Sequence, residues 1–134
     1  MTIFTNEFLK KCEALKDHRD LFPPRIGSLI SRGFADLGFE LFSVLPNDKI
    51  LSLFTGQLSG LNASDTNHFF PVPTVDEFAR KIYELGFLMV SKQLDDSTFQ
   101  VKIRNSEGVV VAEARSRSLL ECMMHVFLSA IVEK

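Results

Sequence analysis

The sequence is poor in the residue types that most often carry recognition or catalysis. It contains no Trp, one Tyr, two Cys and three His among 134 residues. Its aromatic content consists almost entirely of 13 Phe, and a Phe ring has no polar group that could pair with water or with a ligand. The aromatic residues are therefore better suited to a dry core than to a wet recognition face.

Neither sign of charge is in strong excess. The 15 Lys and Arg oppose 17 Asp and Glu, which gives a formal net charge of −2, and no region has the basic excess typical of a dedicated nucleic-acid-binding protein. No segment approaches the run of about 18 apolar residues that a membrane span requires. The first residues also lack the basic and apolar regions of a secretory signal. The sequence therefore predicts a cytoplasmic protein that does not span a membrane.

Motifs for catalysis and for metal or cofactor binding are missing. The sequence has no glycine-rich phosphate-binding loop and neither the zinc-protease nor the serine-hydrolase motif. The kinase-like tripeptide His18-Arg19-Asp20 lacks its companion elements. Cys12 and Cys122 lie far apart and outside any zinc-like spacing. We therefore expect no catalytic residue, no metal and no cofactor, and we expect two reduced, buried thiols.

The N-terminal half combines helical and extended patterns. Apolar residues at helical spacing predict helices over residues 5–17 and 26–37, with Gly38 as the C-terminal cap of the second. Two short apolar runs, residues 39–45 and 49–54, follow around a Pro-Asn-Asp turn. This pattern predicts a β-hairpin.

A long loop and a well-marked helix follow. Residues 56–68 are rich in Gly, Ser, Asn and Asp and predict a surface loop. Thr74 and Glu77 have the spacing of a capping box, in which each side chain accepts a backbone N–H at the start of a helix. The helix is predicted over residues 75–85, with Gly86 as its C-terminal cap.

The C-terminal part predicts three strands and a final helix. Residues 98–104 alternate apolar and polar side chains, as a strand does in a sheet with one wet face. Residues 87–94 and 109–115 are expected to be its neighbours. Residues 118–121 form a second capping box, which opens a helix that ends near residue 132.

A repeated Leu-Gly-Phe motif suggests two related halves. The motif occurs at residues 37–39 and 85–87, and it predicts αββ-like half-repeats over about 22–55 and 70–134. The alternative is that glycine caps recur in any helix followed by a hairpin. The expected fold class is α+β, a two-layer sandwich of about five antiparallel strands and four helices in a single domain, residues 1–134.

The α-β-β-β-α order expected for residues 74–134 resembles a double-stranded RNA-binding domain. Residues 108–118 and the following helix are similar to that family's third strand and final helix. The family grips phosphates with Lys at the start of this helix, where this chain has Leu119, Leu120 and Met123. The sequence therefore favours a protein partner, with structured-RNA binding as the alternative. The residues that would bind RNA are Lys102, Arg104, Arg115 and Arg117.

A second resemblance extends over about residues 69–134. A Phe-Phe-Pro motif at 69–71 leads into a helix, and Val-Ala-Glu-Ala at 111–114 runs into an apolar final helix. These features are similar to small accessory proteins of bacteriophages and prophages of the phage ABA sandwich type. That family is largely uncharacterised, so the resemblance implies an origin rather than an activity.

The functional hypothesis that follows is a non-enzymatic module that binds a protein, which would be a host protein if the phage origin holds. The final helix has an apolar arc of about 200°, wider than the stripe of about 100° that meets one core. This surplus predicts a protein interface, as a homodimer or with a partner. The predicted interface residues are Leu119, Met123, Met124, Phe127 and Leu128. A small-ligand pocket invisible in the sequence is a third hypothesis.

Overall fold

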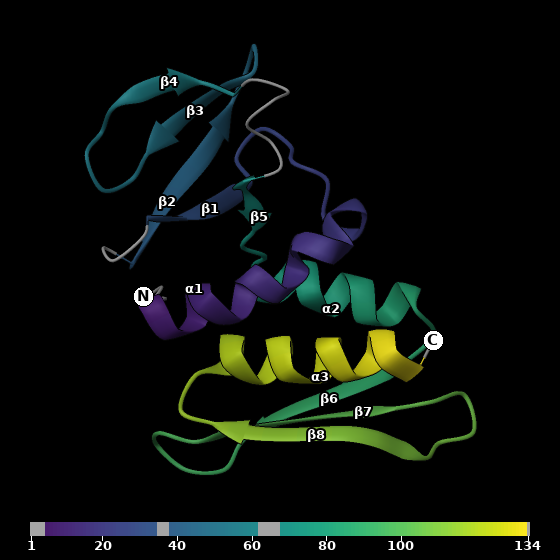
Figure 1. The fold of residues 1–134 in the computed structure, drawn as a ribbon. Coiled ribbons are helices and arrows are strands. Elements are labelled where there is room, and N and C mark those ends of the chain that lie inside the picture. The colour runs from purple at the N-terminus through teal and green to yellow at the C-terminus, as the bar shows by residue number, and fades with distance from the viewer. Residues whose placement is uncertain (1–4, 35–37, 62–67, 134) are drawn as a thin grey trace. The chain divides into compact units, whose positions relative to one another are not determined.

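The computed structural model describes residues 5–34, 38–61 and 68–133. Within them the chain is an α+β protein with three α-helices, one 3-10 helix and two antiparallel sheets of five and three strands (Figure 1). The backbone contacts gather in two compact units, Met1–Pro73 and Thr74–Lys134. Each unit is described by itself.

The first unit begins with helical structure. In α1 (Asn6–Cys12), the Thr5 hydroxyl accepts the N–H of Phe8 and so caps the N-terminus. The chain then tightens into a 3-10 helix, η1 (Glu13–Leu21). The helix predicted at the N-terminus is confirmed in position, although only its first part is α-helical.

The sheet of the first unit has the strand order β4-β3-β2-β1-β5. Its strands are β1 (Leu29–Phe34), β2 (Gly38–Leu45), β3 (Lys49–Ser52), β4 (Leu58–Gly60) and β5 (Phe70–Pro71). The predicted hairpin is confirmed as β2 and β3. Its turn includes Asn47 and Asp48, both with positive φ, a conformation that Asn and Asp tolerate better than most residues. The predicted loop over 56–68 contains β4, and residues 62–67 of it lie outside the described residues.

The helix predicted over residues 26–37 is wrong. Strand β1 occupies most of this segment and pairs with β2 on one side and β5 on the other. Ile30 and Ser31 are both buried, at 6% and 0% exposure, because successive strand residues point to opposite faces and both faces are covered. This two-sided burial removes the alternating pattern by which a strand with one wet face is recognised in a sequence. Residues 35–37 of the predicted helix lie outside the described residues.

One face of this sheet holds an apolar cluster with a cation among its rings. The cluster consists of Ile30, Phe42, Val44, Ile50 and Phe69, with Leu61 packed against it. The rings of Phe42 and Phe69 meet edge to face, with centroids 5.4 Å apart. The guanidinium carbon of Arg32 lies 5.3 Å from each ring centroid, within reach of a cation–π interaction.

The second unit has the α-β-β-β-α order that the sequence predicts. Its elements are α2 (Val75–Glu84), β6 (Leu88–Gln93), β7 (Phe99–Arg104), β8 (Val110–Ser116) and α3 (Leu119–Glu133). The sheet order is β6-β7-β8. Helix α3 packs against β7 and β8, and α2 packs against α3 and β6. Both helices therefore cover the same face of the sheet (Figure 1).

The predicted capping box of α2 is confirmed. The Thr74 hydroxyl accepts the N–H of Glu77 at 3.2 Å, and the Glu77 carboxylate accepts the N–H of Thr74 at 3.1 Å. At the start of α3, the Ser118 hydroxyl accepts the N–H of Glu121, whose carboxylate accepts the hydroxyl of Ser116. Side chains thus fix where both helices begin.

Replacing Thr74→Ala is expected to lower the free energy of unfolding by about 1 kcal/mol, because an N–H at the start of α2 loses its acceptor. Thr74→Ser keeps the hydroxyl and should stay close to the unmodified chain. Urea denaturation followed by circular dichroism measures both variants. Equal stability of the alanine and serine variants would contradict the cap.

The internal repeat is not confirmed. Only the second half has a helix followed by a hairpin, because a strand replaces the helix expected in the first half. Gly38 and Gly86 have φ of 87° and 94°, a region that glycine enters without strain. The shared glycine thus marks a left-handed residue at the start of β2 and shortly before β6. The single-domain expectation stays a prediction, and the boundary between the two contact units falls at Pro73 and Thr74.

Candidate functional site

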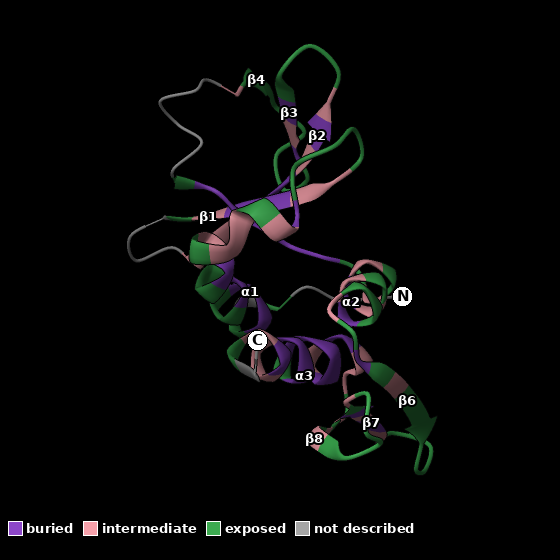
Figure 2. Ribbon diagram, turned by 90° about the vertical axis from the view of Figure 1, so that its right-hand side faces the viewer, coloured by how far each residue is buried: buried purple, intermediate pink, exposed green. Residues whose placement is uncertain are grey.

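The chain itself covers most of the interface predicted on α3. Three of the five residues are at most 1% exposed, namely Met123, Met124 and Phe127. The other two, Leu119 and Leu128, are half-buried. The Phe127 ring contacts Phe78 of α2, with centroids 5.5 Å apart, and Figure 2 shows α3 as a largely buried helix. The three buried residues therefore do not form an exposed interface, and the predicted homodimer loses the observation that motivated it.

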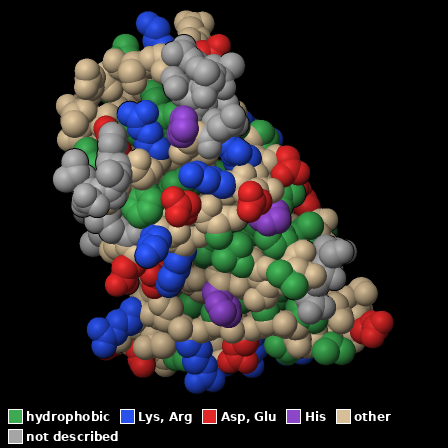
Figure 3. Space-filling view, viewed as in Figure 1, with side chains coloured by type: hydrophobic (Ala, Val, Ile, Leu, Met, Phe, Trp, Pro, Cys, Tyr) green, Lys and Arg blue, Asp and Glu red, His purple; other side chains and the backbone are tan. Residues whose placement is uncertain are grey.

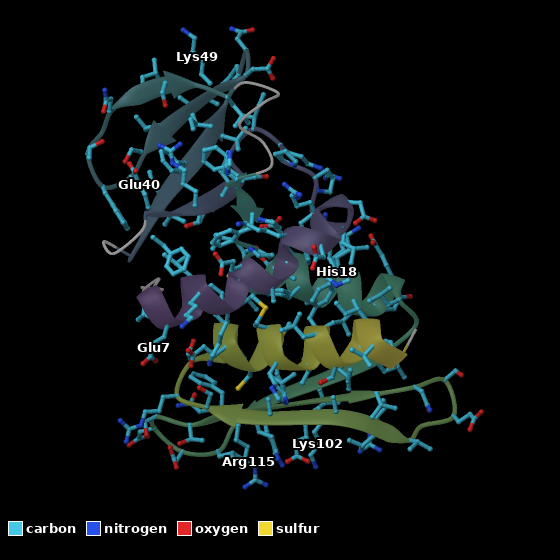
Figure 4. The ribbon with its side chains drawn as sticks, viewed as in Figure 1. Glu7, His18, Glu40, Lys49, Lys102 and Arg115 are labelled. Atoms are coloured by element: carbon cyan, nitrogen blue, oxygen red, sulfur yellow. The ribbon has the colours of Figure 1, made fainter. Side chains whose placement is uncertain are left out.

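The opposite face of the three-stranded sheet is a better candidate site. On β7, Val101 and Ile103 are 0% exposed and point toward the helices, so Gln100, Lys102 and Arg104 point to the other face. Figure 4 shows Lys102 and Arg115 on the side of the sheet away from α3. We call this side the outer face.

The outer face brings together three of the four basic residues proposed for RNA binding. Lys102 and Arg104 come from β7, and Arg115 of β8 lies opposite Gln100. Arg117, the fourth, is exposed and follows the end of β8. A further cation, Lys92 of β6, pairs with Gln100 on its other side.

Glu113 is the one acidic side chain among the outward positions of these three strands. It lies opposite Lys102. Its carboxylate accepts a hydrogen bond from the amide of Gln100 and lies 3.4 Å from Nε of Arg115. Gln100 is only 2% exposed, so this bond satisfies a buried amide. The outer face therefore has a net positive charge, and its one carboxylate is bound by Gln100 and Arg115.

Strand β6 exposes two large aliphatic side chains beside these cations. Leu88 is 60% exposed and Val90 is 55% exposed. In the register of β6 and β7, they lie opposite Arg104 and Lys102. Because residues 87–90 form a continuous apolar run, the sequence reads as a strand buried on both sides. Sequence reasoning therefore missed this exposed pair.

Strand β6 also has a free edge. Among the strands of the described residues it pairs with β7 alone, and five of its six residues are exposed. The Leu94 N–H donates to the Thr98 carbonyl, so these two residues form a hydrogen-bonded pair. Hydrogen-bonded and non-hydrogen-bonded pairs alternate from that point along two antiparallel strands. This alternation places the backbone groups of Met89, Ser91 and Gln93 on the edge away from β7.

Two cysteines and one aspartate among the described residues have a pKa shifted from its ordinary value. Cys12 and Cys122 are free and buried, as predicted, and burial raises the pKa of both thiols. Asp95 accepts the N–H of Ser97, which lowers the pKa of the Asp95 carboxyl. Within the described ranges, no three His, Cys, Asp or Glu side chains are grouped so that they could hold a metal ion.

Comparisons with models of protein families, with curated proteins and with solved structures give no match for this chain. The resemblances to phage proteins and to double-stranded RNA-binding domains therefore stay predictions. None of the helices in the described part of the chain combines the length and apolarity needed to cross a membrane.

Proposed function

We propose that this chain is a non-enzymatic protein-binding module that takes up an extended, acidic segment of a partner protein along β6. The observation that supports it is the aliphatic pair Leu88 and Val90, exposed on a strand with a free edge and in register with two cations. Large exposed aliphatic side chains on an unpaired edge favour the addition of another strand.

The added strand would be held in two ways. Its backbone would pair with the outward N–H and C=O groups of Met89, Ser91 and Gln93. Its outward side chains would lie beside Leu88 and Val90 at the distance of a cross-strand pair, about 5 Å. Apolar side chains at these positions would remove both aliphatic groups from water.

Charge determines which segment fits. Lys92 lies on β6 itself, whereas Lys102 and Arg104 lie one strand further from the added segment, about 10 Å away. Long acidic side chains on the segment can bridge that distance to the long basic ones. Glu113 lies opposite Lys102 and beside Arg115, but as a single carboxylate it offsets only part of the charge of Lys92, Lys102, Arg104 and Arg115. An acidic segment is therefore preferred over a basic one.

The outer face suits a protein better than RNA. Its edge strand exposes Leu88 and Val90, and the outward positions of the three strands include no aromatic ring on which a base could stack. Among the described residues on the side of the molecule seen in Figure 3, which views the three-stranded sheet edge-on, acidic and basic side chains are intermingled. Phosphate recognition depends on clustered cations, so RNA remains the alternative.

A synthetic peptide tests the proposal directly. The probe is about ten residues long, which is enough to span the six residues of β6. Its outward positions carry valine beside Leu88 and Val90 and glutamate toward Lys92, and its inward positions carry threonine, because successive strand residues point to opposite faces. One matched peptide replaces glutamate by lysine, and another carries central prolines that prevent strand pairing. We expect binding of the first peptide alone, with NMR shift changes on β6. Equal binding of the proline peptide would overturn strand addition.

The variant Ser91→Pro is expected to weaken binding of the acidic peptide at least about tenfold. Proline removes an N–H that points off the edge, so the β6–β7 pairing survives while the added strand loses a hydrogen bond. Ser91→Thr keeps the N–H and should bind like the unmodified chain. Undiminished binding by the proline variant, with its fold intact by circular dichroism, would refute the assigned edge.

Two further measurements test whether duplex RNA or a second copy of this chain binds in place of the acidic segment. A salt-titrated gel shift with duplex RNA would favour the alternative if binding is steeply salt-dependent and is weakened by Lys102→Gln and Arg115→Gln. Light scattering over a range of concentrations would identify a second copy as the occupant if Ser91→Pro abolishes a dimer. Either result would replace the acidic partner in our proposal.

A further inference from the structure

The first unit contains a pocket that the sequence did not reveal. Its volume is about 380 Å³, within the range of roughly 300–1,000 Å³ found for small-molecule sites. It is lined by Arg19, Phe22, Pro24, Ile30, Leu61, Phe69, Phe70 and Pro71. Because three separate segments and β1 contribute to it, no local sequence pattern could indicate it.

The walls of the pocket are set by the fold of the unit. Ile30 of β1 lies opposite Pro71 in the pairing with β5. Phe69 belongs to the buried cluster, and Phe70 is only 1% exposed. These side chains are fixed by the core, so this part of the cavity is formed before any ligand arrives. A preformed site costs less ordering on binding.

Among the described residues that line the pocket, Arg19 is the only charged one. It lies near the end of η1, and its Nε donates to the carbonyl of Lys16 at 2.9 Å. This bond holds one edge of the guanidinium of Arg19, which is a residue of the pocket lining. Lys16 adds a second positive charge nearby, with Nζ 5.9 Å from the centroid of the Phe70 ring. The other seven described residues of the lining are apolar.

We propose that this pocket binds a small monocarboxylate with an aromatic body. The carboxylate would accept hydrogen bonds from the Arg19 guanidinium, a pairing strengthened by opposite charge and planar geometry. The body would lie among Phe22, Phe69 and Phe70, whose rings favour edge-to-face contact with another ring. This inference is independent of the outer face, because it concerns residues of the first unit alone.

Hydrocinnamate and hydrocinnamyl alcohol form a matched pair of probes. They share the phenyl ring and differ in the carboxylate, so the difference in affinity measures the charged contact. In NMR titrations of the full chain, we expect hydrocinnamate to shift signals of the lining residues and to bind at least about tenfold more tightly than the alcohol. Equal affinities, or no shifts at the lining residues, would overturn the proposal.

The variant Arg19→Gln assigns the charged contact. It should weaken hydrocinnamate binding about tenfold and leave the alcohol unchanged, because only the carboxylate loses a partner. Arg25→Gln removes a nearby exposed cation that does not line the pocket and serves as the control. Arg19→Lys keeps the charge and should retain part of the affinity. Unchanged hydrocinnamate binding by folded Arg19→Gln protein would exclude the assigned role.

Discussion

Phe127→Ala is expected to lower the free energy of unfolding by about 3–5 kcal/mol. The Phe127 side chain is 0% exposed, and its ring contacts the equally buried ring of Phe78. Truncation removes the apolar surface that α3 buries against α2 and leaves a cavity that a packed core fills only in part. The loss should be among the largest that a single substitution causes in the second unit.

Phe54→Ala is the matched control, because Phe54 is 60% exposed and its loss should change stability by no more than about 0.5 kcal/mol. Urea denaturation followed by circular dichroism measures both variants. A small effect of Phe127→Ala, combined with a change in molecular mass by light scattering, would return Phe127 to the role of an interface residue. A large loss of stability at unchanged mass supports its place in the core.

The second unit could be predicted because its signals are local. The capping box of Thr74 and Glu77 marks where α2 begins, and Gly86 marks where it ends. Val101 and Ile103 alternate with polar residues, so the inner face of β7 is visible in the sequence. Each signal depends on neighbouring residues alone, and none of them requires knowledge of the tertiary structure.

The first unit could not be predicted because its pairing is non-local. Strand β1 is defined by β2 and by β5, a strand of only two residues, Phe70–Pro71. A strand covered on both faces has no alternating pattern, and its apolar residues fall by coincidence at helical spacing. The sequence between residues 26 and 37 therefore indicates a helix that the tertiary contacts do not form.

The candidate site was predictable only in part. The sequence identified Lys102, Arg104 and Arg115 by their charge, but a sequence cannot show that β6 is an edge strand, because strand order is a property of the whole sheet. Leu88 and Val90 became visible as a binding feature only once that order was known. The apolar arc of α3 pointed to a different surface, since its width reflects two neighbouring layers, the sheet and α2.

Both cysteine thiols are expected to react with a disulfide reagent at least about a thousandfold more slowly in the native protein than in urea, since reaction requires opening of a fold stable by about 5 kcal/mol. Cys12 and Cys122 are 0% exposed. The Cys122 thiol also donates to the Phe99 carbonyl, so α3 must separate from β7 before Cys122 can react.

Protonation adds to this protection. Burial raises the pKa of both thiols, and Glu121 raises that of Cys122 further. At about pH 8, close to the ordinary thiol pKa of about 8.5, the unfolded chain has a substantial thiolate population and the native chain has much less. The folded state binds the two thiol protons more tightly than the unfolded state does. The contribution of these protons to the free energy of unfolding is therefore fully present below the ordinary thiol pKa. It is lost as the pH rises above it.

Labelling kinetics of Cys12→Ala and Cys122→Ala measure the two thiols one at a time, with the same proteins in urea as the reference. Slow reaction of both confirms that α1 and α3 are each held in a closed core. Rapid, stoichiometric labelling of either thiol would contradict its burial. Because Cys12 lies in the first unit and Cys122 in the second, a large difference between the two rates would show that one unit opens while the other stays folded, which would in turn contradict the predicted single domain.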